Sequence, residues 1–547
     1  MTTSVSKKAT ILKPAFAFLS LFLTILHVLL VKGRDLVTFT WTEHFRLYIG
    51  VIVLLAVLFT YFFYLCLTHT LYYLSFYYIG KKNKTFLSYF RFFIGYFLFM
   101  GVFWLLTWPG IFKGDEFYVI RAALSFTMSG AQSGITSLFY MVALLFFPSM
   151  ASITFIQILL ICTIFSVIMH DLFSVLSGQK RYFLFLPFIL LPVIDGNLFT
   201  LRATLVGWIF LFVLAKVYYL TKTDCFSGKW LLVLSALTGL LCAWRSEFIY
   251  LVVFLPLAFL LLKKIHLKQA VCILVLSLVF FMLCNIPNKI ALNGSNKYPI
   301  SLVLNPVANL FTEVEDLKGP CVYDDVMTIN ELVDASLLRR TASVRNISQY
   351  WNIDDVLPKR TLNRFMQASL RLIIYNPDKF LKYRWQTFAY TNGLYPGYIN
   401  HPGGECIDAI NKLVYYGNDY KSYFAFMNPP FGQALREKTI SFLACRHYEQ
   451  DNIRTNAMLP VFYNCIPGVI FLLVLFISNC IAVLRARKKQ HGSIDRYVLC
   501  IVLILLTLPQ LILIFLTAPA MFFMYYFGFY LSSYFLTVLS CLELTGQ

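Results

Sequence analysis

The densest cluster of ionisable side chains follows a Trp-Pro-Gly run. Within WPGIFKGDEFYVIR, the acids Asp115 and Glu116 are adjacent, and Lys113 and Arg121 flank them. A carboxylate held in such a loop could take a proton from a hydroxyl group as a general base. The competing role is structural, with Asp115 as the N-cap and Glu116 in the first turn of a helix over 117–126. The spacing alone favours capping.

A second acid, Asp195, lies in the segment PVIDGNLFTLR, with Asn197 and Arg202 after it. A carboxylate and a guanidinium in one short segment could bind a polar substrate. Gly196 and Asn197 are, however, residues typical of an ordinary turn. The segment therefore predicts a turn that carries one candidate acid and one candidate base.

The third cluster, Trp244 to Glu247, interrupts an otherwise apolar stretch over 230–262. Arg245 and Glu247 are costly within apolar surroundings unless they pair or line a polar cavity. A local Arg245–Glu247 ion pair at the tip of a helical hairpin is the structural alternative to a functional role.

The composition requires these clusters to be positioned by a membrane protein. Hydrophobic residues make up 59% of the 547-residue chain, charged residues 13%, and the mean hydropathy is +0.71. A soluble globule of this composition would lack polar surface. Crossing the bilayer takes roughly 20 apolar residues, and twelve spans are predicted, the first of them uncleaved. Their approximate bounds are 14–31, 47–69, 86–107, 151–169, 182–195, 203–220, 230–243, 248–262, 269–286, 459–484, 497–517 and 520–541.

The spans divide the chain into four parts. Residues 1–85 hold two N-terminal spans, and 86–286 hold a core with the first outer loop. A mostly helical, water-facing domain over 287–458 separates the ninth span from the tenth, and 459–547 hold the last three. The shortest spans, 182–195, 230–243 and 248–262, are expected to line a protein interior. Helices are expected over 328–345 and 361–375. A disulfide could join two of Cys321, Cys406 and Cys445, but the spacing does not show which two.

The positive charge fixes the orientation of these parts. The net charge of +20 lies mostly in short loops between spans, so no nucleic-acid partner is needed. The apolar run 135–147 is too short to cross. If it does not cross, the basic loops share the cytoplasmic side, as the positive-inside rule predicts. Both termini are then cytoplasmic, and the 287–458 domain lies outside a cell membrane.

On this topology the separate clusters share one face. Asp115, Asp195, Arg202, Arg245 and Glu247 all fall on the non-cytoplasmic side of the bilayer, although long stretches of sequence separate them. One outer site is therefore expected.

The order of these features resembles the GT-C class of polytopic glycosyltransferases. The shared features are a span ending in WPG, an acid-bearing loop, a short apolar helix, a second outer acid, a WRSE segment and a late outer domain. More narrowly, the chain resembles a bacterial branch with WPG or YPG before an Asp. The resemblance covers roughly 86–262 in motif. The chain departs from many relatives in having Gln132 to Thr136 where they carry His-Pro, and Arg202-Ala203 in place of a Lys-Asp pair.

The resemblance implies transfer of a sugar from a polyprenyl-phosphate donor in the bilayer to a glycan, lipid or protein acceptor outside the cytoplasm. Asp115 matches the active-centre acid of the family and would be the base. Arg202 and Arg245 would stabilise the leaving phosphate. The supporting residues would be Glu116, Arg121, Asp195 and Glu247, and a Mg or Mn ion could be shared by Asp115 and Asp195.

Two other functions remain open from the sequence. A transporter or flippase of a lipid-linked or anionic solute would need polar residues at mid-membrane and broken helices. A polymerase or ligase of lipid-linked glycans would share the outer face and its basic residues.

Overall fold

The computed structural model describes residues 17–27, parts of 50–64, 84–112, 114–124, 127–129, 133–146, 149–294, 298–345, 356–395, 428–449, 452–455, 458–489 and 494–545. Nearly all the regular structure in these ranges is helical, apart from one two-stranded hairpin. The architecture is that of a helical polytopic membrane protein, as predicted.

Seven of the described helices are long and apolar enough to cross a membrane. Six of them are α3 (Lys84–Leu106), α6 (Met150–Val175), α8 (Arg202–Thr223), α11 (Leu267–Cys284), α22 (Ile494–Thr517) and α23 (Phe527–Leu544), and the seventh is α21 (Ile466–Lys489) with the short helix before it. A bent pair would make an eighth. Helices α9 (Gly228–Trp244) and α10 (Leu251–Leu261) are shorter. Of the first two predicted spans, 14–31 contains the described apolar helix Ala17–His27, which is shorter than a span, and 47–69 is described only in fragments. Twelve spans therefore remain a prediction.

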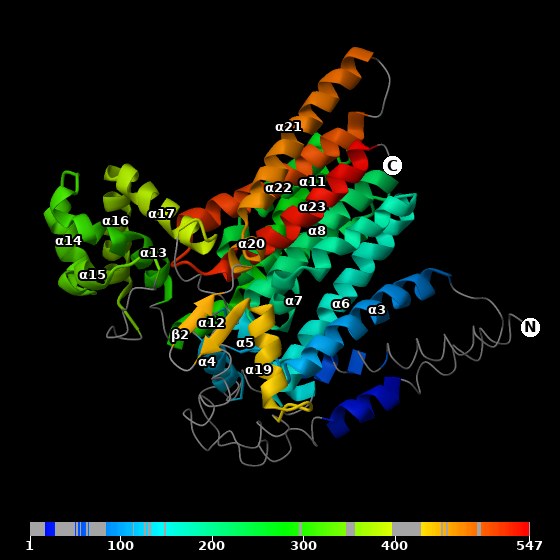
Figure 1. Cartoon of the computed structure of the whole chain (residues 1–547), viewed down its shortest axis with the longest axis horizontal. Helices are drawn as coiled ribbons and strands as arrows, with labels where there is room; N and C mark the ends of the chain where they lie inside the picture. The colour runs from blue at the N-terminus through cyan, green and yellow to red at the C-terminus, as the bar shows by residue number, and fades with distance from the viewer. Residues whose placement is uncertain are drawn as a thin grey trace, which may run out of the picture.

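Helix α8 is the centre of the bundle. It packs against α6, α9, α22 and α23, and most of its side chains are buried, including Trp208 and Tyr218. Helix α3 lies along α6, α21 lies along α22 and α23, and α9 pairs with α11 (Figure 1). One hydrophobic core runs through all of these helices.

The predicted span 182–195 is a broken helix pair rather than one straight span. A 3-10 helix, η1 (Gln179–Ile189), joins α7 (Leu191–Leu198) at an angle of 56°. Pro187 lies inside η1, and Pro192 occupies the first turn of α7. Because proline removes a backbone donor and fixes φ, it ends or bends a helix. Asp195 therefore lies inside a short helix, and its predicted position in a turn is wrong.

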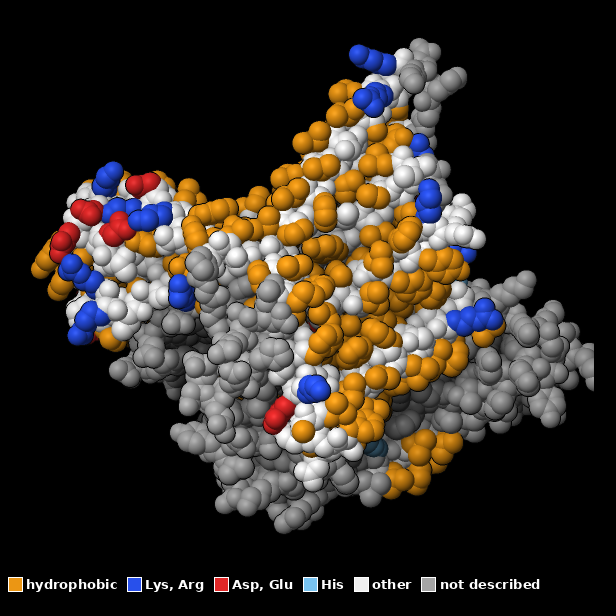
Figure 2. Space-filling view, in the orientation of Figure 1, with side chains coloured by type: hydrophobic (Ala, Val, Ile, Leu, Met, Phe, Trp, Pro, Cys, Tyr) orange, Lys and Arg blue, Asp and Glu red, His pale blue; other side chains and the backbone are white. Residues whose placement is uncertain are grey.

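Polar contacts define two ends of the bundle. At the end that we call the basic end, Lys264 pairs with Asp224, Lys222 with Glu543, and His170 with Ser88. The opposite end, here the domain end, carries the residues between α11 and α21. Figure 2 shows Lys and Arg side chains at the tip of α21, beyond a hydrophobic surface.

Helix α5 (Gly134–Phe146) lies across the domain end. The Gly134 amide donates to Asn288 Oδ1 (2.8 Å), just after α11, and Ala143 O accepts from the Ser152 hydroxyl at the start of α6. Both ends of this 13-residue helix thus contact the same end of the bundle. The helix is among those too short to cross a membrane.

The region expected as one domain over 287–458 has two described parts. The first, which we call the lobe (residues 298–395), follows α12 (Ile286–Gly294). It contains α13 (Tyr298–Ala308), η3 (Asn309–Asp316), α14 (Val322–Asn330), α15 (Ala335–Thr341), α16 (Lys359–Tyr375) and α17 (Pro377–Thr391). These elements share a separate hydrophobic core. The helix expected over 328–345 is wrong as a single element, because Asp334 caps a new helix, α15, by accepting from the amides of Ser336 and Leu337.

The second part lies against the bundle itself. It contains α19 (Gln433–Leu443), strands β1 (Arg446–Glu449) and β2 (Asn452–Thr455), and α20 (Leu459–Phe462). The strands pair antiparallel with Arg446 opposite Thr455. Helix α19 packs on α3 and α7, so this segment belongs to the domain end and not to the lobe.

The three short spans line the protein interior with one face only. Buried side chains such as Phe188, Leu241 and Leu255 lie on η1, α9 and α10, and the same elements expose Phe183 (56%), Leu232 (47%) and Val253 (52%). Cys321 and Cys445 are free thiols. Cys406 lies outside the described residues.

The packing of α9 on α11 depends on Gly239. A methyl group there would come within 2.6 Å of Phe280 Cβ and of the Phe281 backbone nitrogen. Gly239→Ala should therefore force the helices apart and cost about 1–3 kcal/mol, seen as a lower midpoint of thermal unfolding in detergent. Gly101→Ala on α3 is the matched control, since no atom lies within 4 Å of its added methyl group. Equal midpoints for the two variants would contradict the close packing.

Candidate functional site

Two acid-bearing segments lie side by side at the domain end. The Ile111 amide donates to Leu198 O (3.1 Å), and the Thr200 amide donates to Ile111 O (3.4 Å). Ile111 and Phe199 thus form a parallel bridge between the segment after Trp108-Pro109-Gly110 and the segment after α7. The structure thus places the start of the acidic loop next to the Asp195 segment.

The acidic loop is the beginning of helix α4 (Gly114–Leu124). Asp115 is the second residue of this helix and not its N-cap, so the predicted N-cap position of Asp115 is wrong. The Asp115 side chain lies outside the described part of the chain. Glu116 is fully buried, whereas Arg121 is exposed on the last turn of α4.

Glu116 faces Tyr140 of α5. Burial, and then the Glu116 charge, raise the pKa of Tyr140 well above its usual value. The phenol therefore stays protonated, and it donates to Thr200 O (2.9 Å) on the bridged segment. Glu116, expected only as a supporting residue, is thus part of the contact between α4, α5 and the bridge.

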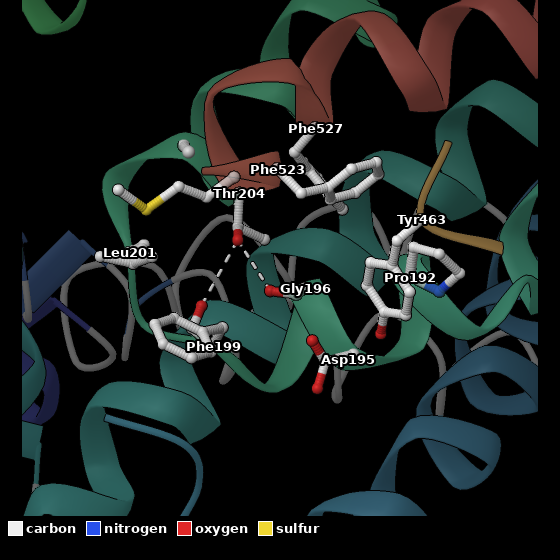
Figure 3. A pocket seen from close by; sticks show the side chains of 11 residues that line it. Pro192, Asp195, Gly196, Phe199, Leu201, Thr204, Tyr463, Phe523 and Phe527 are labelled. Atoms are coloured by element: carbon white, nitrogen blue, oxygen red, sulfur yellow. Dashed lines mark hydrogen bonds between the residues drawn. The ribbon is translucent and has the colours of Figure 1, made fainter. Parts of the chain in front are cut away.

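Asp195 is buried beside a small cavity of about 20 Å³. The cavity takes about one water molecule. Gly196, Thr204, Tyr463, Phe523 and Phe527 also line it. Figure 3 shows the Asp195 side chain extending from α7 away from Thr204 and Phe527, on the side of the Tyr463 hydroxyl. Burial, and then the Asp195 charge, raise the pKa of the Cys445 thiol to about 11, so this thiol is protonated at neutral pH.

A polar network holds the backbone around Asp195. Asn197 accepts from Trp208 Nε1 (2.7 Å) and donates to the Tyr96 hydroxyl (3.0 Å). Gln157 Nε2 donates to the carbonyls of Asn197 (2.9 Å) and Phe199 (2.6 Å). Three bundle helices thereby fix the end of α7. From the sequence Asn197 is predicted only as a turn residue, and no pattern marks Gln157 as its neighbour.

The remaining predicted residues do not line this cavity. Arg202 is the first residue of α8, between the cavity-lining residues Leu201 and Ala203. Arg245 forms an ion pair with Glu247, and its guanidinium lies 5.6 Å from the centre of the Tyr525 ring. The structural alternative for this cluster, an ion pair in a hairpin tip, is confirmed. The tip belongs to the domain end, because Trp244 Nε1 donates to Thr136 of α5 (3.0 Å).

Arg436 of α19 is a further residue of the site that the sequence analysis missed. Its Nε donates to Trp108 O (2.8 Å) and its Nη2 donates to Gly110 O (3.3 Å), and the side chain is buried. Arg384 of α17 makes a similar contact, donating to Ala518 O after α22, and burial lowers its pKa to about 10. Neither position carries a local signal, because both residues lie in ordinary amphipathic helical patterns.

A buried ion pair also lies at the basic end. Lys216 of α8 pairs with Asp171 of α6, and the Lys216 ammonium lies 4.1 Å from the centre of the Trp230 ring. Lys216 lies inside the predicted span 203–220, so this charge within a span is visible in the sequence, although it is not among the predicted site residues.

No three potential metal ligands gather among the described His, Cys, Asp and Glu residues. Of the two acids considered for Mg or Mn, Asp195 is described as buried and the Asp115 side chain is not described. The arrangement can position buried carboxylates, a protonated phenol and an arginine at one end of a membrane-type bundle.

Arg436→Gln should loosen the WPG turn. Losing its two charged hydrogen bonds should cost about 1.5–3 kcal/mol each, so we expect a lower unfolding midpoint and faster amide hydrogen exchange in the peptide over 108–112. Arg339→Gln is the control, because it removes an exposed ion pair with Glu315 and should change little. Unchanged exchange in Arg436→Gln would show that the arginine does not hold the turn.

No protein-family model matches the chain, and neither the curated proteins nor the solved structures yield a match.

Proposed function

We propose that the chain is a membrane glycosyltransferase that moves a sugar from a polyprenyl-phosphate donor to an acceptor outside the cytoplasm. The observation that carries the proposal is the Ile111–Phe199 bridge, because it brings the start of α4 to Asp195. A donor held in the bilayer and an acceptor in water can meet only at such an end of a bundle.

In this proposal Asp115 takes the proton of the acceptor hydroxyl, and the hydroxyl oxygen attacks the anomeric carbon as the bond to the lipid phosphate breaks. Glu116 and Tyr140 orient the start of α4. Arg202 is the better candidate of the two arginines for the leaving phosphate, since Glu247 already neutralises Arg245. The cavity at Asp195 takes only about one water, so the site must open to admit a sugar.

The orientation belongs to the same proposal. The chain crosses a cell membrane with about twelve spans. The basic end and both termini face the cytoplasm, and the lobe and α5 lie outside. The separation of basic loops from the domain end supports this orientation.

Transport is the second candidate, and two observations favour it. The η1–α7 pair is bent by 56°, and Lys216–Asp171 is a buried charge pair toward the basic end of the spans. Broken helices are typical of transporters, and buried ion pairs within spans often mark ion pathways. The two functions predict different sensitive residues, namely Asp171 and Lys216 for transport and Asp115 for transfer.

Asp115→Asn should abolish transfer of a radiolabelled sugar from its polyprenyl-phosphate carrier, with a loss on the order of a hundredfold or more. The unfolding midpoint should fall only slightly, because removing one negative charge from the first turn of a helix costs about 0.3–1 kcal/mol. Asp195→Asn should also lower the rate, through the arrangement of the site.

Asp224→Asn at the basic end is the control for these variants. Asp224 is exposed with φ of 50°, a conformation that asparagine also tolerates. Near-normal transfer by Asp115→Asn would remove this residue from the mechanism. Solute transport that is lost in Asp171→Asn and retained in Asp115→Asn would favour the transporter.

Single cysteines at 118, 340 and 488 test the orientation in a cysteine-free background. An impermeant maleimide should label positions 118 and 340 in intact cells and should label 488 only after permeabilisation. Tyr118 and Arg340 are exposed and stand on either side of α5 in the sequence. Labelling of 118 and 340 from opposite sides would mean that α5 or a later element crosses differently.

A further inference from the structure

The lobe exposes a row of large apolar side chains along the elbow between α16 and α17. Leu370 (55%), Ile374 (61%) and Tyr375 (47%) lie on α16, and Leu381 (48%) and Trp385 (50%) lie on α17. We call these five residues the elbow stripe. A row of this kind on a water-facing lobe indicates a surface that contacts something apolar.

The opposite faces of the two helices already have partners within the lobe. Phe365, Ala368 and Leu372 of α16 are in the lobe core, as are Phe380 and Tyr383 of α17. The elbow stripe is thus a second apolar face of α16 and α17, whose other faces are already buried in the lobe core. Folding of the lobe does not explain why this second face is apolar.

The stripe is continuous with the apolar surface of the bundle. The Trp385 ring lies 5.9 Å from Phe388, and Phe388 lies 6.0 Å from Phe515 at the end of α22. Leu516 of α22 packs on the lobe core, and Ile512, one turn deeper, is 56% exposed. Figure 2 shows hydrophobic side chains continuing from the lobe onto the bundle (compare α17 and α22 in Figure 1).

We infer that the elbow stripe lies in the lipid surface at the domain end, so that α17 is an interfacial helix. Tryptophan and tyrosine are enriched at the membrane–water boundary, and an amphipathic helix there buries its apolar face among lipid head groups and upper acyl chains. Lys382, next to Leu381, is 54% exposed, and its ammonium pairs with Glu313 (2.9 Å), so a charged and hydrated pair adjoins the apolar row. The inference requires membrane embedding but is independent of the transferase reaction.

Spin labels at 374, 381 and 385, each as a single cysteine in protein reconstituted into liposomes of phosphatidylethanolamine and phosphatidylglycerol, test the contact. Oxygen concentrates in lipid, and a nickel chelate stays in water. At all three positions we expect oxygen to collide with the label more often than the chelate does. Position 512 is the lipid-facing control, and position 340, on the exposed side of α15, is the aqueous control.

Two outcomes would overturn the inference. Collision rates at 374, 381 and 385 that match position 340 would place the stripe in water. Low rates for both reagents would mean that protein covers the stripe, and a dipolar broadening of the spectrum would identify a second copy of the chain as the cover. Loss of sugar transfer in an otherwise lipid-exposed variant would bear on the proposed function alone.

Discussion

The backbone of α7 ends inside the bundle, and every polar group that it leaves unpaired must be satisfied there. In an apolar interior an unsatisfied amide or carbonyl costs several kcal/mol. Gln157 of α6 donates to the carbonyls of Asn197 and Phe199, and the Thr204 hydroxyl donates to that of Gly196. The Ile111 amide donates to the Leu198 carbonyl. Because the backbone at the end of α7 is hydrogen-bonded to Ile111, these bonds also fix the place where α4 begins.

The predictable part of the fold follows from span length and charge. The long spans at α6, α8 and α22 match apolar runs, because crossing hydrocarbon imposes a length that the sequence displays directly. The short length of α5 was predictable for the same reason. The break at Pro192 was harder to foresee, since the apolar pattern continues through it and only the combination with Pro187 separates two elements.

The candidate site was predictable in part. Topology placed Asp115 and Asp195 on one face, but only the Ile111–Phe199 bridge makes their segments neighbours. Buried Glu116 could not be distinguished from its neighbour, because two adjacent acids at a helix start look alike until the helix phase is known. Arg384 and Arg436 were out of reach for another reason. A buried arginine paired with backbone carbonyls has no partner residue type that a sequence pattern could reveal.

The contact of Arg436 with the Trp108 carbonyl joins positions 328 residues apart. At about 5–20 residues per second, the ribosome takes on the order of 20–60 s to make the intervening chain. During that time α3, α6 and α8 can already be in the bilayer while the WPG carbonyls have no guanidinium. The early half of the protein is therefore only partly assembled until α19 is made. A chaperone or a water molecule that binds the Trp108 and Gly110 carbonyls would most affect the yield of folded protein in this interval.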